Sequence, residues 1–173
     1  MKRLLAIDPG MTNTGYAVLD GPDFVVEAGV LQPDALADPI DRLRSMVKDA
    51  RELVLAHDVF EVVVETPMDV MYGKFSPRSL VSIPWYGIAI GAFVFGVTGV
   101  PVATVSASTW GKHYPRGKKG TKEYRDKAAR IAAVASIYPT IKMPASKAKA
   151  AGMVDAILIG RWWMFDRHAR RGS

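Results

Sequence analysis

Short apolar runs alternate with amphipathic segments along the chain, and this pattern predicts an α/β fold. Five runs, each four to eight residues long, are rich in aliphatic residues and bounded by turn residues, which is typical of buried strands. They cover residues 4–7, 15–19, 24–31, 59–64 and 100–105. The turn signals in residues 8–14 predict that the first two runs form a hairpin.

Helical spacing marks most of the remaining segments. Residues 40–57 carry charges on one face and an apolar set on the other, comprising Ile40, Leu43, Val47, Ala50, Val54 and Leu55. Further helices are predicted over residues 79–98, from the N-cap Ser106 to Trp110, from near Thr121 to Ile137, and over residues 146–165. The basic tail, residues 167–173, is predicted to fray.

Residues 79–111 carry no charged side chain, so a membrane span has to be considered. We predict a buried helix and strand instead, because prolines and several glycines interrupt the run. Gly87 and Gly91 stand four residues apart on one helix face, a spacing that allows close helix approach. A helix this apolar needs cover on every side. Its own sheet and neighbouring helices, or a second copy of the chain, are the two sources of that cover.

Length and composition predict one domain over residues 1–173, with enough apolar residues for a sizeable core. The sequence has no cysteine, which excludes disulfides and thiolate metal sites, and its start carries no secretory signal. Residues 1–111 hold 8 Lys and Arg against 13 Asp and Glu, whereas residues 112–173 hold 15 against 4. The basic half predicts an anionic partner, and nucleic acid, an anionic membrane surface and a merely solvated face are the alternatives.

Three carboxylates stand where core side chains are expected. Asp8 directly follows the first strand, Glu65 follows the fourth, and Asp155 interrupts an apolar stretch of the last helix. Buried charges are expensive unless they are paired or bind a metal. Asp8 as a cap of its own turn and Asp155 on a solvent-facing stripe remain open as alternatives.

A shared crevice would give these carboxylates a purpose. If the first and fourth strands are neighbours, Asp8 and Glu65 lie side by side and Asp155 closes the group from the helix. Carboxylates held that close repel one another unless a cation joins them, and oxygen ligands favour Mg²⁺ or Mn²⁺. Two such ions can promote phosphodiester hydrolysis. With the basic half of the chain, this predicts metal-assisted cleavage of a nucleic-acid backbone.

Three motifs resemble those of the RuvC-like Holliday junction resolvases. IDPGMTNTGYAV, residues 7–18, is similar to the first motif of that family, and VVVETP, residues 62–67, is similar to the second. AAGMVDAILIGRWW, residues 150–163, is similar to the last motif, a helix that carries a catalytic Asp. Their order and spacing match over nearly the whole chain. The stretch SASTWGK, residues 106–112, looks more like the phage-encoded branch.

This resemblance implies an RNase H-like α/β fold, in which a mixed five-stranded sheet, with three antiparallel strands and then two parallel ones, is flanked by helices. It implies a homodimeric endonuclease that resolves four-way DNA junctions by symmetric nicks in opposing strands. Asp8, Glu65 and Asp155 carry over as catalytic metal ligands, with Mg²⁺ as the cofactor, two ions per site, and Mn²⁺ as a substitute. The family also has an Asp or His three residues before the last Asp, and this chain has Gly152 there.

The resemblance and the charge pattern together suggest which residues touch the partners. The candidates for DNA contact are an aromatic and basic loop after Glu65 and a basic stretch after Trp110, represented by Tyr72, Lys74, Phe75, Arg78, Lys112, Arg116, Lys118, Lys119 and Lys122. The candidates for the dimer interface are Gly87, Gly91 and Phe95. The expected location is the cytoplasm of a bacterial cell, with no membrane partner.

Three other functions remain as alternatives. The protein could cut flaps and other branched DNA, or it could bind junctions with impaired cleavage because of Gly152. The first motif also resembles that of actin-like ATPases, but the chain lacks a second comparable domain with its own phosphate loop.

Overall fold

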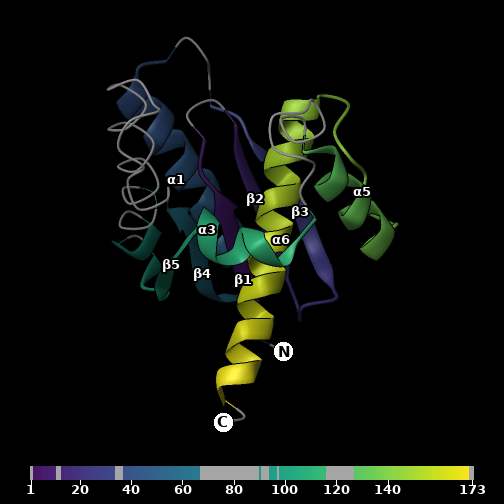
Figure 1. The fold of residues 1–173 in the computed structure, drawn as a ribbon. Helices are drawn as coiled ribbons and strands as arrows, with labels where there is room; N and C mark the ends of the chain where they lie inside the picture. The colour runs from purple at the N-terminus through teal and green to yellow at the C-terminus, as the bar shows by residue number, and fades with distance from the viewer. Residues whose placement is uncertain are drawn as a thin grey trace, which may run out of the picture.

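The chain folds around one five-stranded sheet (Figure 1). This computed structural model describes residues 2–10, 13–33, 37–66, 90, 94–96, 98–115 and 127–171, with side chains described as far as residue 166. The strands are β1 (Arg3–Asp8), β2 (Thr14–Leu19), β3 (Val25–Leu31), β4 (Val59–Thr66) and β5 (Val102–Ser106). Their order across the sheet is β3-β2-β1-β4-β5.

The sheet is mixed. β2 pairs antiparallel with both β1 and β3, whereas β4 pairs parallel with both β1 and β5. The predicted topology is therefore confirmed, and β1 and β4 are central neighbours. Because parallel strands place their carboxyl ends at the same edge, the residues that end β1 and β4 lie together.

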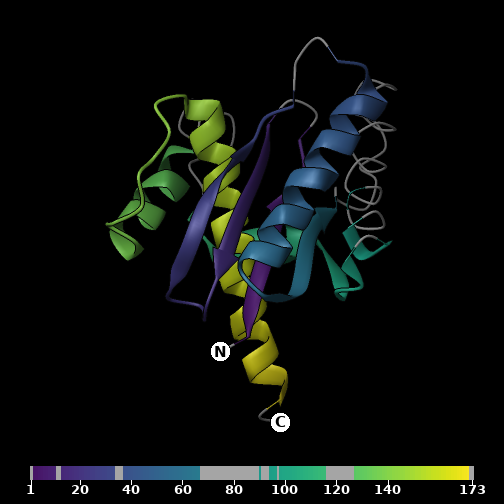
Figure 2. The ribbon, with the colours of Figure 1, turned by 180° about the vertical axis from the view of Figure 1, so that it is seen from behind.

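Helices cover both faces of the sheet (Figures 1 and 2). Helix α1 (Pro39–Ala56) lies on one face and begins at Asp38, whose side chain accepts hydrogen bonds from the backbone N–H groups of Ile40 and Asp41. The long helix α6 (Lys147–Arg171) crosses the other face. Helix α5 (Ala128–Ile137) packs against α6, and the short α3 (Ala107–Trp110) and the 3₁₀ turn η1 (Gly111–His113) follow β5.

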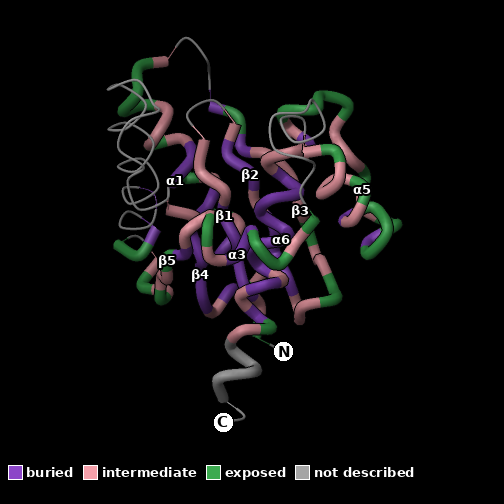
Figure 3. Tube along the Cα trace, in the orientation of Figure 1, coloured by how far each residue is buried: buried purple, intermediate pink, exposed green. Residues whose placement is uncertain are grey.

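Alternation along the strands builds a core on each side of the sheet, and the strands are buried along most of their length (Figure 3). Leu5 and Ile7 of β1 join the core beneath α1, which includes Met46, Ala50 and Val54. Leu4 and Ala6 join the core beneath α6, which includes Val154, Ile157 and Leu158. Asp8 continues the second series, so its side chain belongs to the α6 face.

Several predicted boundaries change. Ile40 and Leu55 were assigned to the apolar face of the first helix but are exposed, while Met46 takes a core position. Ser106 precedes α3 as predicted, yet its hydroxyl contacts the hydroxyls of Ser108 and Thr109 rather than a backbone N–H. The prediction of a frayed tail is wrong, because α6 continues to Arg171.

The predicted helix over residues 79–98 lies largely outside the described residues, and those that are described within it, 90, 94–96 and 98, are helical. Among the residues that the structure describes, no helix is long and apolar enough to cross a membrane.

Candidate functional site

Asp8 and Glu65 meet at the edge where β1 and β4 end. The register pairs Ile7 with Val64, so the next residue of each strand, Asp8 and Glu65, stands level with the other. Both belong to the face covered by α6, since Ala6 and Val63, two residues earlier, lie in that core. Their carboxyl groups share a hydrogen bond. The sheet thus brings together the two strand-end carboxylates that the sequence singled out.

The electrostatics of this pair favour a bound positive charge. Burial, the negative charge of Glu65 and the shared hydrogen bond raise the pKa of Asp8 well above its usual value. Burial also raises the pKa of Glu65, and the charge of Asp155 adds to that effect. A proton held between the two carboxyls relieves their repulsion, and a divalent cation would do the same with greater charge.

Asp155 approaches the pair from α6. Its residue is 3% exposed, and its charge contributes to the raised pKa values of both Asp8 and Glu65. It does not lie on a solvent-facing stripe, so that alternative is wrong. Two cations of the α5 segment bind it: Arg130 donates from Nη1 to Oδ1 at 2.8 Å, and Lys127 donates from Nζ to Oδ2.

Lys127 is held by all three carboxylates. Burial lowers its pKa, but the charges of Asp155, Asp8 and Glu65 outweigh burial, so the net pKa is raised. The lysine precedes α5 in a left-handed backbone conformation, with φ of 52°. Such a conformation is uncommon for a residue with a side chain and is found where surrounding contacts enforce it.

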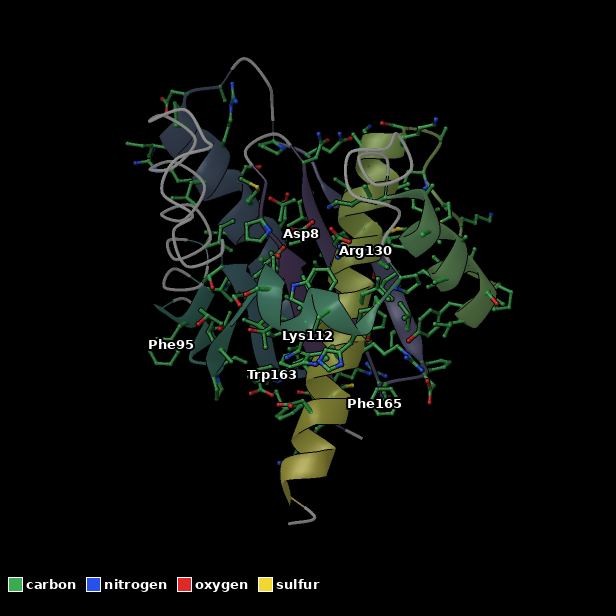
Figure 4. The ribbon with its side chains drawn as sticks, viewed as in Figure 1. Asp8, Phe95, Lys112, Arg130, Trp163 and Phe165 are labelled. Carbon is green, nitrogen blue, oxygen red and sulfur yellow. The ribbon has the colours of Figure 1, made fainter. Side chains whose placement is uncertain are left out.

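Trp110 links the two sides of the site. Its indole Nε1 donates to Glu65 Oε1 at 3.2 Å, and its ring is 1% exposed. The guanidinium of Arg130 lies 4.6 Å from the centroid of that ring. Arg130 therefore stacks on the residue that holds Glu65 while it binds Asp155. Figure 4 shows Arg130 beside Asp8 at the edge where β1 ends.

Two glycines fix how close α6 comes to the sheet. A Cβ added to Gly15 of β2 would lie 2.0 Å from the carbonyl oxygen of Gly152, so the strand and the helix touch through their backbones. A Cβ on Gly152 would meet ordinary contact distances, 3.6 Å from the Gly15 nitrogen and 3.9 Å from Asp8 Oδ2. The position three residues before Asp155 thus faces Asp8, as the resemblance implied, and offers no ligand atom.

The turn after Asp8 is closed by its own residues. A Cβ on Gly10 would lie 2.3 Å from the Asn13 carbonyl oxygen, so the turn requires glycine there. The Thr14 hydroxyl lies within hydrogen-bond distance of both the backbone N–H and the carbonyl of Gly10. Within the described residues no contact shows Asp8 capping this turn, and its carboxyl group faces Glu65 instead.

The donor set fits one cation better than two. Asp8 and Glu65 present adjacent carboxylates of the kind that Mg²⁺ and Mn²⁺ prefer. Both oxygens of Asp155 are already bound by Lys127 and Arg130. In the described part of the chain, no three acidic or histidine side chains are grouped so that they could hold an ion.

The predicted partner-binding residues are mostly outside the described residues; these are Tyr72, Lys74, Phe75, Arg78, Gly87, Gly91, Arg116, Lys118, Lys119 and Lys122. Lys112 lies in η1 and is exposed, and in Figure 4 it is drawn apart from Asp8 and Arg130. Phe95 is 55% exposed, which leaves it free for a contact that the structure does not contain.

Sequence reasoning missed Lys127, Arg130 and Trp110. Asp155 had been expected to need a partner or a metal, and the two cations at a spacing of three residues ahead of α5 were the available signal. Their approach depends on how α5 folds across α6, which no local pattern reveals.

Comparison with known proteins supports the fold. No protein-family model matches the chain, and no curated protein matches it by sequence. Among solved structures, RuvC from T. thermophilus in complex with a Holliday junction substrate has a TM-score of 0.71 at 16% identity, covering 100% of this chain and 98% of that chain. The fowlpox virus resolvase in complex with junction DNA has a TM-score of 0.53 at 13% identity, covering 95% and 98%.

A third similar structure is the yeast mitochondrial Holliday junction resolvase, with a TM-score of 0.50 at 15% identity, covering 94% of this chain and 78% of that one. The chain has the RNase H-like fold of these resolvases across nearly its whole length.

Proposed function

We propose that this protein is a structure-selective endonuclease that resolves four-way DNA junctions by metal-assisted phosphodiester hydrolysis. The observation that carries the proposal is the Asp8–Glu65 pair, two carboxyl groups sharing one hydrogen bond at the ends of adjacent parallel strands, with Asp155 beside them. The fold around this pair is the one that junction resolvases share over their full length. The basic half of the chain provides the charge that a DNA substrate requires.

Each residue of the site has a distinct task in this proposal. Asp8 and Glu65 hold a divalent ion, Mg²⁺ or Mn²⁺, which when bound supplies an activated water and stabilises the charge on the leaving oxygen. Trp110 keeps Glu65 in place through its indole N–H. Asp155, Lys127 and Arg130 form the opposite wall and present positive charge towards an incoming phosphate.

Two further parts of the proposal extend beyond the described residues. A four-way junction is symmetric, so a symmetric homodimer would place two such sites on opposing strands. We place the activity in the bacterial cytoplasm, in a phage-encoded member of this fold.

Cleavage assays on a junction, a flap, a fork and a linear duplex, each with Mg²⁺ or Mn²⁺, test the proposal. We expect paired nicks in the junction and little cutting of the duplex. Asp8→Asn and Glu65→Gln should abolish cleavage and preserve junction binding, because each variant keeps the fold and removes a carboxylate. Equal cutting of linear duplex would refute junction selectivity, and equal cutting of flaps would favour the broader branched-DNA nuclease.

A second candidate function follows from Gly152 and the capped Asp155. If the two cations prevent the site from assembling, the protein binds junctions without cutting them. Tight junction binding with no cleavage at any Mg²⁺ or Mn²⁺ concentration would establish that function in place of the first.

A further inference from the structure

The charges opposite the Asp8–Glu65 pair carry one further inference. Asp155 is buried, and each of its oxygens accepts from a different cation. The Arg130 side chain is 11% exposed and that of Lys127 is 37% exposed. Arg130 is thus part of the interior, and Lys127 reaches the same carboxylate from the rim.

Arg130 is held as a permanent part of this site. A guanidinium stays charged at any pH a protein tolerates. Its plane also stacks on Trp110, which in turn binds Glu65. Moving Arg130 aside to admit an ion at Asp155 would therefore disturb the support of the other metal ligand as well.

The α6 position that could complete a second ion site carries no side chain. Gly152 faces Asp8, and a Cβ there would lie 3.9 Å from Asp8 Oδ2. An ion between Asp8 and Asp155 would find no third ligand from that turn of α6. The missing ligand and the two added cations occur on opposite sides of the same carboxylate.

The charges also balance. Two divalent ions would bring four positive charges to three carboxylates and a phosphate. One divalent ion together with Lys127 and Arg130 brings the same four. The strained backbone of Lys127, which directs its amine at Asp155, shows that the fold commits local strain to this arrangement.

We propose that Lys127 and Arg130 stand in place of a second metal ion, so that the site binds a single divalent ion at Asp8 and Glu65 while the two side chains neutralise Asp155 and supply the remaining positive charge to the phosphate. This inference rests on the proposed nuclease function for its purpose. Its physical content, the number of ions bound, can be measured without any substrate.

The experiment counts Mn²⁺ ions bound per chain by the loss of the free-ion signal in electron paramagnetic resonance. The wild-type chain is expected to bind one ion. The double variant Lys127→Met/Arg130→Gln frees Asp155 and should bind two. Adding Asp155→Asn to that double variant should return the count to one, and Lys127→Arg alone, which keeps the charge, should leave it at one.

A matched control removes the same charges elsewhere. Arg44 and Lys48 are exposed on α1 and pair with Asp41 and Glu52. The variant Lys48→Met/Arg44→Gln should still bind one ion. Circular dichroism checks that each variant is folded, and Lys127→Met alone serves if the double variant is not, with a second and weaker ion expected.

A wild-type count of two ions would overturn the inference whatever the variants do, and so would a folded double variant that still binds one ion. The outcomes separate the two proposals. Two ions with junction cleavage would refute this inference and keep the nuclease. One ion in the wild type, two in the double variant and no cleavage would keep this inference and refute the nuclease.

Discussion

At the scale of single residues, the site depends on side chains that orient other side chains. Glu65 ends a strand and has freedom to turn about its own bonds. Trp110 removes that freedom by donating to Oε1, and Arg130 covers the Trp110 ring. A strand end supplies the carboxylate, but α3 and α5 decide where its oxygens point.

Trp110→Phe tests this orienting role. It keeps a ring beneath Arg130 and deletes the donor to Glu65, so the free energy of unfolding should fall by about 1–3 kcal/mol, as expected for a hydrogen bond to a charged group. Mn²⁺ affinity should also fall, because Glu65 is no longer held. Urea unfolding and Mn²⁺ titration measure the two effects.

Trp163→Phe is the matched control for that variant. Its indole donates to Glu61 at the same 3.2 Å, far down the strand from Glu65. It should lose similar stability and keep Mn²⁺ affinity. If both variants lose affinity equally, the orienting role of Trp110 is refuted.

At the scale of elements, the contact between β2 and α6 sets the height of Asp155 above the sheet. Gly15 and Gly152 touch through backbone atoms, and Gly160, two turns further along, lies against Leu19. No side chain intervenes where the helix passes the functional edge.

Alanine at the two glycines should act in opposite directions. Gly15→Ala forces a Cβ to within 2.0 Å of a backbone carbonyl, so α6 must shift and stability should fall by about 1–3 kcal/mol or more. Gly152→Ala meets only ordinary contacts and gains helix propensity, so it should be neutral or stabilising by up to about 1 kcal/mol. Thermal unfolding measures both, and equal losses would contradict the backbone contact.

A polar cluster fastens the end of α1 to the β2–β3 pair. Tyr16 donates to Glu27 at 2.7 Å, and His57 lies 2.7 Å from the other oxygen of Glu27. The Tyr16 hydrogen bond leads the causes that lower the pKa of Glu27. Burial and then the same bond raise the pKa of Tyr16.

This cluster predicts a stability that falls at both ends of the pH range. Glu27 has a lowered pKa, so its contribution is present above its unfolded value near 4.5 and is lost as pH falls below it. Tyr16 has a raised pKa, so its contribution is lost as pH rises above 10. Urea unfolding across pH should show both losses, and Glu27→Gln should make each shallower. An unchanged profile would exclude the cluster as their source.

Sequence reasoning succeeded where local patterns carry the information. Strand ends at Asp8 and Glu65 follow from short aliphatic runs, and their adjacency follows once β1 and β4 pair. It failed for Ile40 and Leu55, because helical spacing alone does not say how wide a face the sheet covers. It missed Lys127 and Arg130 because their partner lies 28 and 25 residues away along the chain.

At the scale of the whole molecule, charge is segregated along the chain. The first 111 residues are acidic on balance and supply the sheet, whereas the remainder is basic and supplies α5 and α6. A DNA substrate would therefore be attracted to one part of the molecule, and its affinity should fall steeply with salt.

Charge reversal at Lys118 and Lys119 tests the basic stretch that lies outside the described residues. If both lysines contact phosphates, Lys118→Glu/Lys119→Glu should weaken junction binding and reduce the slope of log K against log salt by about 2. Binding titrations at several salt concentrations measure the slope. Arg44→Glu/Lys48→Glu, on α1, is the charge-matched control and should leave the slope unchanged. An equal change in both variants would show that only net charge matters.

The backbone contact between Gly15 and Gly152 has a consequence for how such a protein diverges. Because main-chain atoms alone set the distance from helix to strand at the functional edge, the surrounding core can exchange its side chains over generations without moving Asp155. Sequence identity can erode almost everywhere while the active geometry is inherited unchanged. A pair of residues that contribute no side chain thereby allows the rest of the sequence to drift.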